Sequence, residues 1–298
     1  MKTGTVLVVA LLTSAVAIAG QPEPSQAPTR IVVGGTELHY VQQGKGESVV
    51  LLHGGQGDYR AWPQLLSALA PKYRVVSYSR RYHYPNTNPI SSDHSAIVDA
   101  RDLFGLVQSL GLGRVHLVGT SYGALTALAF AIDHPELVRS LALAEPPAHR
   151  WVEGTRRGAE LFRQFMDTVH RPAGRAFASG ADEAAMRVFV DAFDAPGTFD
   201  RLPSSRRADV MANAPFFKAI SRSPDPFPNL SKDEARRLAV PVLLINGADT
   251  DELHKAVVAE VANVLPNVRR VEIPNAGHGA SRQNPGAFNA AVADFLAR

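Results

Sequence analysis

Two rhythms of apolar and polar residues alternate along most of this chain. Short apolar runs that are typical of buried strands occupy residues 48–52, 74–78, 115–118, 141–144, 240–245 and 269–273. Between them, apolar residues recur with helical spacing at 61–69, 95–110, 124–133, 253–265 and 285–296. A Gly-Gly pair separates two further strand-like segments, 31–33 and 38–41, as in a hairpin. Strands that alternate with helices at this spacing predict an α/β fold. We expect a mostly parallel eight-stranded sheet with helices on both faces.

This alternation stops between residues 145 and 238. The stretch shows several short helical patterns and no convincing strand pattern. Its aromatic residues are Trp151, Phe162, Phe165, Phe189, Phe193, Phe199, Phe216, Phe217 and Phe227. We expect a helical cap over residues 146–238, inserted after the sixth strand into a core formed by 30–145 and 239–298. Most of these rings should fill the interior of the cap, and a few should line a cavity.

The N-terminus carries a pattern of its own. Lys2 precedes an apolar stretch at 6–18, and residues 17–19 offer a small-x-small cleavage site, which predicts a signal peptide over 1–19. An uncleaved anchor is the alternative. Residues 20–29 read as an extended, proline-rich linker. The pattern predicts a bacterial protein that is periplasmic or secreted, with no stable membrane insertion after cleavage. The absence of cysteine is compatible with an oxidising compartment.

The charge of the chain and its distribution bear on whether the protein binds nucleic acid. The formal net charge is +3, from 31 basic and 28 acidic residues. The basic residues are scattered along the chain and form no stripe interleaved with aromatic residues. We therefore expect no nucleic-acid partner.

The pentapeptide Gly119-Thr120-Ser121-Tyr122-Gly123 carries the strongest chemical signal. It follows a predicted strand and opens a predicted helix, which is the context of a nucleophile elbow. In such an elbow the serine sits on a sharp, strained turn that lifts its hydroxyl clear of the sheet. The alternative is a chance match in a glycine-rich loop.

A serine hydroxyl needs an adjacent base, and histidine is the natural choice near neutral pH. Of the ten histidines, His278 lies in a glycine-flanked loop directly after the last predicted strand, at the edge where sites of open α/β sheets gather. His53, with Gly54 and Gly55, follows an inner strand, and we expect its side chain to tie down that loop. The backbone amides of Gly55 and Tyr122 are our candidates for an oxyanion hole.

Taken together, these segments resemble the α/β-hydrolase-fold serine hydrolases, esterase-like and with a helical lid, over nearly everything after the linker. The resemblance implies an oxyanion amide at the loop after His53, a nucleophile at Ser121, a base at His278 and no metal or organic cofactor. One departure lies after the fourth strand, where residues 80–85 read Arg-Arg-Tyr-His-Tyr-Pro in place of a glycine-rich loop. We expect Tyr82 and Tyr84 to shape the substrate pocket.

A second departure concerns the acid of the triad. The family usually places an aspartate three residues after a glycine that ends the seventh strand, but counting from Gly247 leads to Thr250. Asp249 and Asp251 stand one position to either side. A minority of the family takes the acid from the end of the sixth strand, where Glu145 stands. A carboxylate there is costly unless it has a partner. We favour Glu145, with Asp249 as the alternative acid and Asp251 third.

These features predict a serine hydrolase that cleaves a small-molecule carboxylic ester or lactone through an acyl-enzyme on Ser121. A serine at the elbow argues against dehalogenases and epoxide hydrolases of this fold, which use aspartate there. Alternatives on the same triad are a C–C bond hydrolase, an acyltransferase, cofactor-free perhydrolysis and a macrolide-type lactone esterase. The tyrosine-rich loop and the Glu-Pro-Pro segment at 145–147 suggest the last of these. The non-enzyme alternative is a ligand receptor on the hydrolase scaffold.

Overall fold

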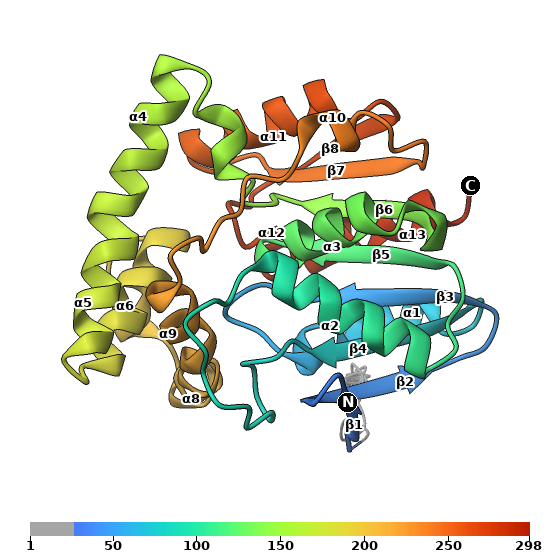
Figure 1. Cartoon of the computed structure of the whole chain (residues 1–298), viewed down its shortest axis with the longest axis horizontal. Coiled ribbons are helices and arrows are strands. Elements are labelled where there is room, and N and C mark those ends of the chain that lie inside the picture. Colours follow the sequence, from blue (N-terminus) through green and yellow to red (C-terminus); the bar gives the residue numbers. More distant parts are fainter. Residues whose placement is uncertain (1–26) are drawn as a thin grey trace, which may run out of the picture.

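One sheet of eight strands forms the centre of the molecule (Figure 1). In the computed structural model, which describes residues 27–298, the strands are β1 (Thr29–Val33), β2 (Thr36–Gln43), β3 (Glu47–Leu52), β4 (Tyr73–Ser79), β5 (Val115–Thr120), β6 (Val138–Ala144), β7 (Val242–Gly247) and β8 (Val268–Ile273). Their order across the sheet is β1-β2-β4-β3-β5-β6-β7-β8. β2 runs antiparallel to β1 and β4, and all other neighbours are parallel. The prediction of a mostly parallel eight-stranded sheet is confirmed.

The predicted signal peptide, residues 1–19, lies outside the described residues, as does the predicted linker up to residue 26. β1 begins at Thr29, so the last residue assigned to the linker already belongs to the sheet. Among residues 27–298, every helix is too short or too polar to cross a bilayer.

Helices pack on both faces of the sheet, as predicted. Their bounds are α1 (Pro63–Leu69), α2 (Ala96–Ser109), α3 (Tyr122–Asp133), α11 (Glu252–Val264), α12 (Ala280–Gln283) and α13 (Pro285–Leu296). On one face, Leu103 of α2, Leu128 of α3 and Val257 of α11 belong to one buried apolar cluster. On the other face, Leu65 of α1 and Phe288 of α13 belong to a second cluster. Both faces are therefore closed to water, which explains why the inner strands read as continuous apolar runs.

Two boundaries differ from the sequence prediction, each because of a proline. The helix expected from residue 61 begins at Pro63, because residues Tyr59–Ala61 form a separate 3-10 turn and proline favours the first position of a helix. The strand expected from residue 240 begins at Val242, because Pro241 has no N–H to donate to a sheet.

The carboxyl ends of the parallel strands meet at one edge of the sheet. Thr120 of β5 pairs with Ala144 of β6, and Ala144 pairs with Ile245 of β7. The residues that follow these strands continue the ladder: the Ser121 amide donates to Ala144 O (2.8 Å) and the Glu145 amide donates to Ile245 O (3.1 Å). The register therefore fixes Ser121 and Glu145 as near neighbours.

A helical cap follows β6 and covers this edge, as predicted (Figure 1). Its helices are α4 (Arg156–Phe165), α5 (Arg171–Ala178), α6 (Asp182–Phe193), α7 (Thr198–Arg201), α8 (Ser204–Ala212) and α9 (Ala214–Arg222). The short α10 (Lys232–Ala235) lies beside α11, where Lys232 pairs with Glu260 at 2.5 Å (Figure 1). Phe189 of α6 and Phe217 of α9 pack with ring centroids 4.5 Å apart in the interior of the cap. The Tyr122 hydroxyl donates to Pro226 O (2.8 Å), which ties the cap to the first turn of α3.

Candidate active site

Ser121 occupies the turn between β5 and α3, with φ 50° and ψ −124°. Non-glycine residues adopt this conformation rarely and at a cost, so the surrounding structure must impose it. A Cβ at Gly119 would lie 2.7 Å from the Ala124 backbone, and one at Gly123 would lie 2.3 Å from Leu52 O. Only glycine fits at these two positions. The strand, sharp turn and helix predicted around Ser121 are confirmed.

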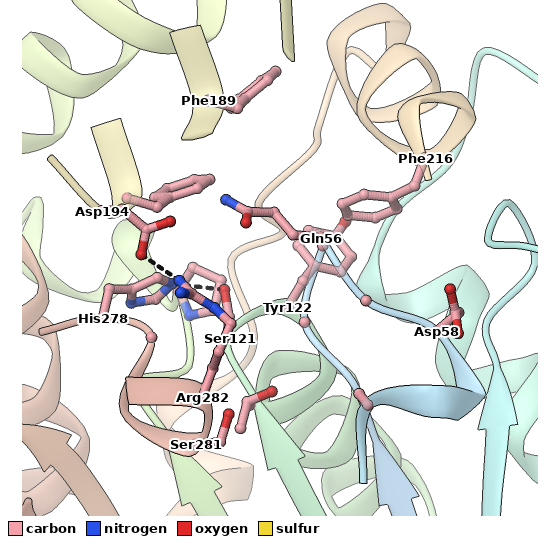
Figure 2. A pocket seen from close by; sticks show the side chains of 18 of the residues that line it. Gln56, Asp58, Ser121, Tyr122, Phe189, Asp194, Phe216, His278, Ser281 and Arg282 are labelled. Atoms are coloured by element: carbon pink, nitrogen blue, oxygen red, sulfur yellow. Dashed lines mark hydrogen bonds and ion pairs between the residues drawn. The ribbon is translucent and has the colours of Figure 1, made fainter. Parts of the chain in front are cut away.

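His278 lies directly beside this hydroxyl (Figure 2). Its Nε2 is 2.9 Å from Ser121 Oγ, and its Nδ1 is 2.7 Å from Oε2 of Glu145. Burial, followed by the positive charge of His254, lowers the pKa of His278 below its ordinary value. The ring is therefore neutral near pH 7. With Nδ1–H donated to the carboxylate, Nε2 is free to accept a proton from Ser121.

Glu145 is buried, with a relative exposure of 1 %, at the end of β6. Its Oε1 accepts from the Gly247 amide and its Oε2 accepts from the Thr250 hydroxyl, both at 2.8 Å. Burial acts to raise the pKa of Glu145, but the hydrogen bond with His278 and the nearby histidine charges outweigh it and leave the pKa below its ordinary value. This buried group is therefore a carboxylate. Its partners are the ones that a buried charge requires.

The structure does not bring Asp249, the alternative acid, to His278. The Asp249 side chain is exposed, and among residues 27–298 its carboxylate makes no hydrogen bond to that ring. Its amide donates to Ala276 O (2.9 Å), which holds the turn after β7 with this side chain facing outward. Asp251 caps α11 by accepting from the His254 amide at 3.0 Å, and its carboxylate also contacts the His254 ring. Neither aspartate takes the place that Glu145 occupies.

The loop after β3 lies opposite the elbow and is held by His53, as expected. Burial and the charge of Arg80 lower the pKa of His53 to about 3, so the ring is neutral. Its Nε2 accepts from the Arg80 amide (3.1 Å), so its Nδ1 carries the proton and donates to Gly54 O (2.8 Å). Gly55 packs so closely under the cap that a Cβ would lie 2.7 Å from the Phe217 ring.

The two predicted oxyanion amides belong to residues that border one cavity. Gly55 and Tyr122 line it together with Ser121. Tyr122 is the first residue of α3, so its N–H has no acceptor within the helix. The oxyanion role of these amides stays a prediction.

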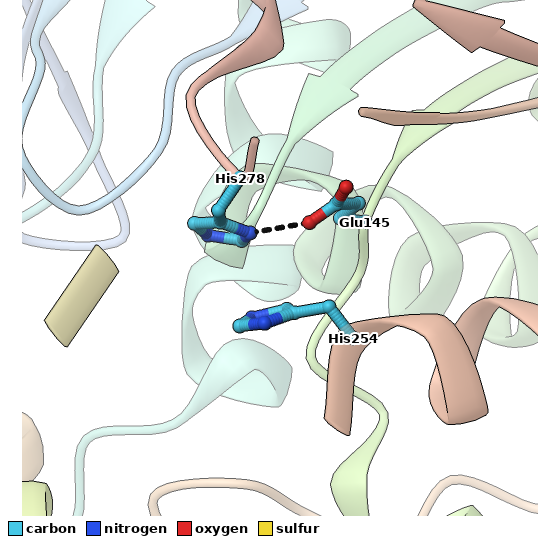
Figure 3. A group of neighbouring side chains, drawn as sticks. All are labelled: Glu145, His254 and His278. Carbon is cyan, nitrogen blue, oxygen red and sulfur yellow. Dashed lines mark hydrogen bonds and ion pairs between the residues drawn. The ribbon is translucent and has the colours of Figure 1, made fainter. Parts of the chain in front are cut away.

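His254 was missed by sequence reasoning. It is buried in the first turn of α11, and its ring centroid lies 4.0 Å from that of His278 (Figure 3). The Asp-x-x-His spacing at the start of a helix could have shown the pair with Asp251, but nothing in the sequence shows the contact with His278. Glu145, His254 and His278 offer ligand atoms within 4.8 Å of one another. A divalent cation could be held there only by displacing the His278–Glu145 hydrogen bond.

A cavity of about 500 Å³ opens above Ser121, between the core and the cap. Aromatic side chains form much of its wall: Trp62, Tyr122, Phe165, Phe189, Phe193, Phe216, Phe217 and Phe227. Polar side chains also border it, among them Gln56, Asp194, Arg206 and Arg282, with Arg282 paired to Asp194 (Figure 2). Six of the nine aromatic residues of the cap border the cavity, so the expectation that most of them fill the interior of the cap and only a few line a cavity is wrong in its proportions. Trp151, Phe162 and Phe199 do not border it.

The expectation for the tyrosine-rich loop is wrong, because neither Tyr82 nor Tyr84 borders the cavity. Tyr82 is buried and accepts from the Ser91 amide (3.0 Å), while Tyr84 is 42 % exposed beneath the Arg60 guanidinium. The reason is Arg80, which is buried and pairs with Asp99 at 2.5 Å. The Arg80 guanidinium also lies 4.6 Å from the centroid of the Phe216 ring, which borders the cavity, so this loop packs behind the cavity wall.

Comparison with known proteins agrees with this fold. A family model described as alpha/beta hydrolase fold matches residues 47–285. A 2-hydroxy-6-oxo-6-phenylhexa-2,4-dienoate hydrolase from Burkholderia cepacia is 26% identical over 87% of this chain and 91% of its own length. A putative carbamate hydrolase RutD from Klebsiella pneumoniae (strain 342) is 29% identical over 85% of this chain and 92% of its own.

Solved structures show the same fold. The enol-lactonase from Burkholderia xenovorans LB400 superimposes with a TM-score of 0.71 at 24% identity, covering 91% of this chain and 100% of its own. A thermophilic esterase from Thermogutta terrifontis gives a TM-score of 0.72 at 21% identity, with 91% of this chain and 98% of its own covered. At these identities the likeness shows the architecture alone.

Proposed function

The chain belongs to the alpha/beta hydrolase fold family, and from this we propose that it is a serine hydrolase that cleaves a carboxylic ester or lactone. One observation carries the proposal: an unbroken line of hydrogen bonds runs from Ser121 through His278 to Glu145, at 2.9 and 2.7 Å. Nucleophile, base and orienting carboxylate lie within hydrogen-bond reach in the order that acyl transfer requires.

In the proposed reaction, Nε2 of His278 takes the proton of Ser121 as Oγ attacks the acyl carbonyl. Glu145 keeps the proton of the neutral ring on Nδ1 and stabilises the imidazolium that forms. His278 then protonates the leaving alcohol, and the acyl group remains on Ser121. Water repeats the sequence on the acyl-enzyme and releases the acid.

The oxyanion of each tetrahedral intermediate is assigned to the amides of Gly55 and Tyr122. The positive end of the α3 dipole lies at the same point and favours negative charge. The aromatic wall of the cavity suits an apolar acyl or ring portion of the substrate, and polar groups of the substrate can reach Gln56 or Arg206.

Labelling with a fluorophosphonate probe tests the nucleophile directly. We expect one adduct on Ser121 of the folded protein and none on a Ser121→Ala variant. A series of p-nitrophenyl esters of increasing chain length, run beside a small panel of lactones, then defines the acyl group. Folded protein that forms no adduct and turns over no ester would favour a ligand receptor on this scaffold.

C–C bond hydrolysis is the second candidate, because the relative from Burkholderia cepacia is named for a dienoate substrate of that kind. The same triad and cavity would serve both reactions. An assay with a 2-hydroxy-6-oxo-dienoate, followed by loss of its absorbance, separates them: cleavage faster than that of any ester or lactone would replace our first proposal. The macrolide alternative receives no support from Tyr82 and Tyr84, which lie away from the cavity.

A further inference from the structure

We propose that His254 and Asp251 act through His278 and keep this base unprotonated in mildly acidic solution, which extends the working range of the enzyme below neutral pH. The inference rests on the proposed function, since it assigns to this pair the tuning of the base in that triad. His254 is a positioning residue in this scheme and takes no proton from Ser121.

The geometry places two histidine–carboxylate pairs face to face. His278 with Glu145 forms one pair, and His254 with Asp251 forms the other. The two ring centroids are 4.0 Å apart, with the planes inclined by 36°. Both histidines are secluded from bulk water, so their charges are weakly screened.

The residues around His254 favour one positive charge on the two histidine–carboxylate pairs. On its own helix it faces Asp251, and from the end of β6 it faces Glu145. The His149 ring approaches from the segment after β6, with a centroid distance of 6.0 Å, and burial keeps its pKa well below the ordinary value, so it is neutral.

Other packed elements add little charge. Phe193 of α6 is apolar, with its ring centroid 6.5 Å from that of His254. From α4, Arg157 pairs with Glu252 at the exposed start of α11, which balances both charges. Two carboxylates therefore face two histidines that can each become charged.

The order of protonation follows from these contacts. Burial acts to lower the pKa of His254, but Asp251 and then Glu145 outweigh it, and the pKa lies above its ordinary value. The first proton therefore goes to His254. A second positive charge on His278, at a ring distance of 4.0 Å, is opposed by this cation, and the two rings titrate as a coupled pair. Since a general base works only when unprotonated, the acid limb of the activity lies lower than His278 alone would give.

The Asp251→Asn variant tests this through charge alone. Asparagine caps a helix as well as aspartate does, so the bond from the His254 amide is retained and the ring stays in place. Without the carboxylate, the pKa of His254 falls, so this ring is neutral down to a lower pH than before and no longer opposes protonation of His278 there. Asp251 itself acts on His278 more weakly than His254 does, so losing the cation is the larger effect.

The readout is the acid limb of kcat/KM between about pH 4 and 9. We expect its apparent pKa to rise by roughly half to one unit in Asp251→Asn, within the ordinary range of environmental shifts. His254→Phe, which keeps a ring but carries no charge, should move the limb in the same direction. Asp249→Asn is the matched control, since it removes an exposed carboxylate on the same turn, and its limb should stay in place.

The inference would be overturned if the acid limb stayed in place in both Asp251→Asn and His254→Phe while Ser121 was still labelled. That result would leave the proposed function intact. Failure of the wild-type protein to label at Ser121 would instead remove the proposed function. If Asp251→Asn does not fold, His254→Phe alone decides the question by the same shift.

Discussion

Thr250 donates a 2.8 Å hydrogen bond to Oε2 of Glu145, the same oxygen that lies 2.7 Å from Nδ1 of His278. Thr250 stands where the family usually has its aspartate. The hydroxyl supplies no charge, but it fixes the carboxylate that does. Together with the Gly247 amide on Oε1, it allows Glu145 to face His278 from the neighbouring strand.

Replacing Thr250 by valine should therefore slow turnover, although Glu145 remains in the triad. Valine keeps the shape of threonine and removes the donor, and a hydrogen bond to a charged group is worth about 1.5–3 kcal/mol. We expect kcat/KM for a p-nitrophenyl ester to fall by roughly 10- to 100-fold. Thr250→Ser should retain most of the activity, and equal losses in both variants would show that the hydroxyl is not what matters.

Glu145→Gln separates the two candidate acids. Glutamine cannot stabilise an imidazolium by charge, and removing a triad acid costs about 10⁴-fold in turnover. Asp249→Asn should remain near wild type, as an exposed substitution does. Both variants are compared by kcat at a pH where His278 is neutral. A collapse of activity in Asp249→Asn alone would move the acid back to the turn after β7.

Gly123→Ala tests the steric argument for the elbow. A Cβ there would lie 2.3 Å from Leu52 O, so the helix start or β3 must shift, and overpacking of this kind costs about 1–3 kcal/mol. We expect a lower midpoint of thermal unfolding and loss of Ser121 labelling. Gly154→Ala is the control, because a Cβ at that position meets nothing within 4 Å. Equal melting temperatures for the two variants would contradict the steric account.

Phe193→Ala should change which acyl groups the site prefers. The Phe193 ring borders the cavity 5.3 Å from the His278 ring, so its removal opens space beside the base. The ratio of kcat/KM for long over short p-nitrophenyl esters should rise by about tenfold or more, as expected for a few methylenes accommodated in an apolar pocket. Phe162→Ala removes a ring of the cap that does not border the cavity and should leave this ratio unchanged.

Much of the fold could be predicted because its signals are local. Burial requires the apolar runs of β3 and β5, and steric contact requires the glycines around Ser121. Both constraints restrict the type of residue at the position concerned. His278 could be placed because a loop after the last strand must lie at the carboxyl edge of the sheet.

The choice of acid depended on information that is not local. Glu145 and Asp249 both follow strands at the same edge, and only the orientation of the turn after β7 turns Asp249 outward. The contact of His254 with His278 joins two segments of the chain that no pattern relates. Tyr82 and Tyr84 were misplaced because their loop packs behind the cavity wall through contacts of Arg80 with Asp99 and Phe216, which likewise join distant segments of the chain.

Glu145 is also the residue at which the chain leaves the sheet and enters the cap. Its amide donates to Ile245 O, and its carboxylate accepts from Gly247 at the end of β7 and from Thr250 in the turn that follows. Pro146 and Pro147 come directly after it. The acid thus lies on the same anchored segment as Pro146 and Pro147, the root of the cap. Any rearrangement that moves this root disturbs the triad as well, whereas the far side of the cap has no such tie to the acid. For engineering, this sets a practical boundary: a foreign cap can be grafted only downstream of Pro147, with the glutamate and both prolines left in place.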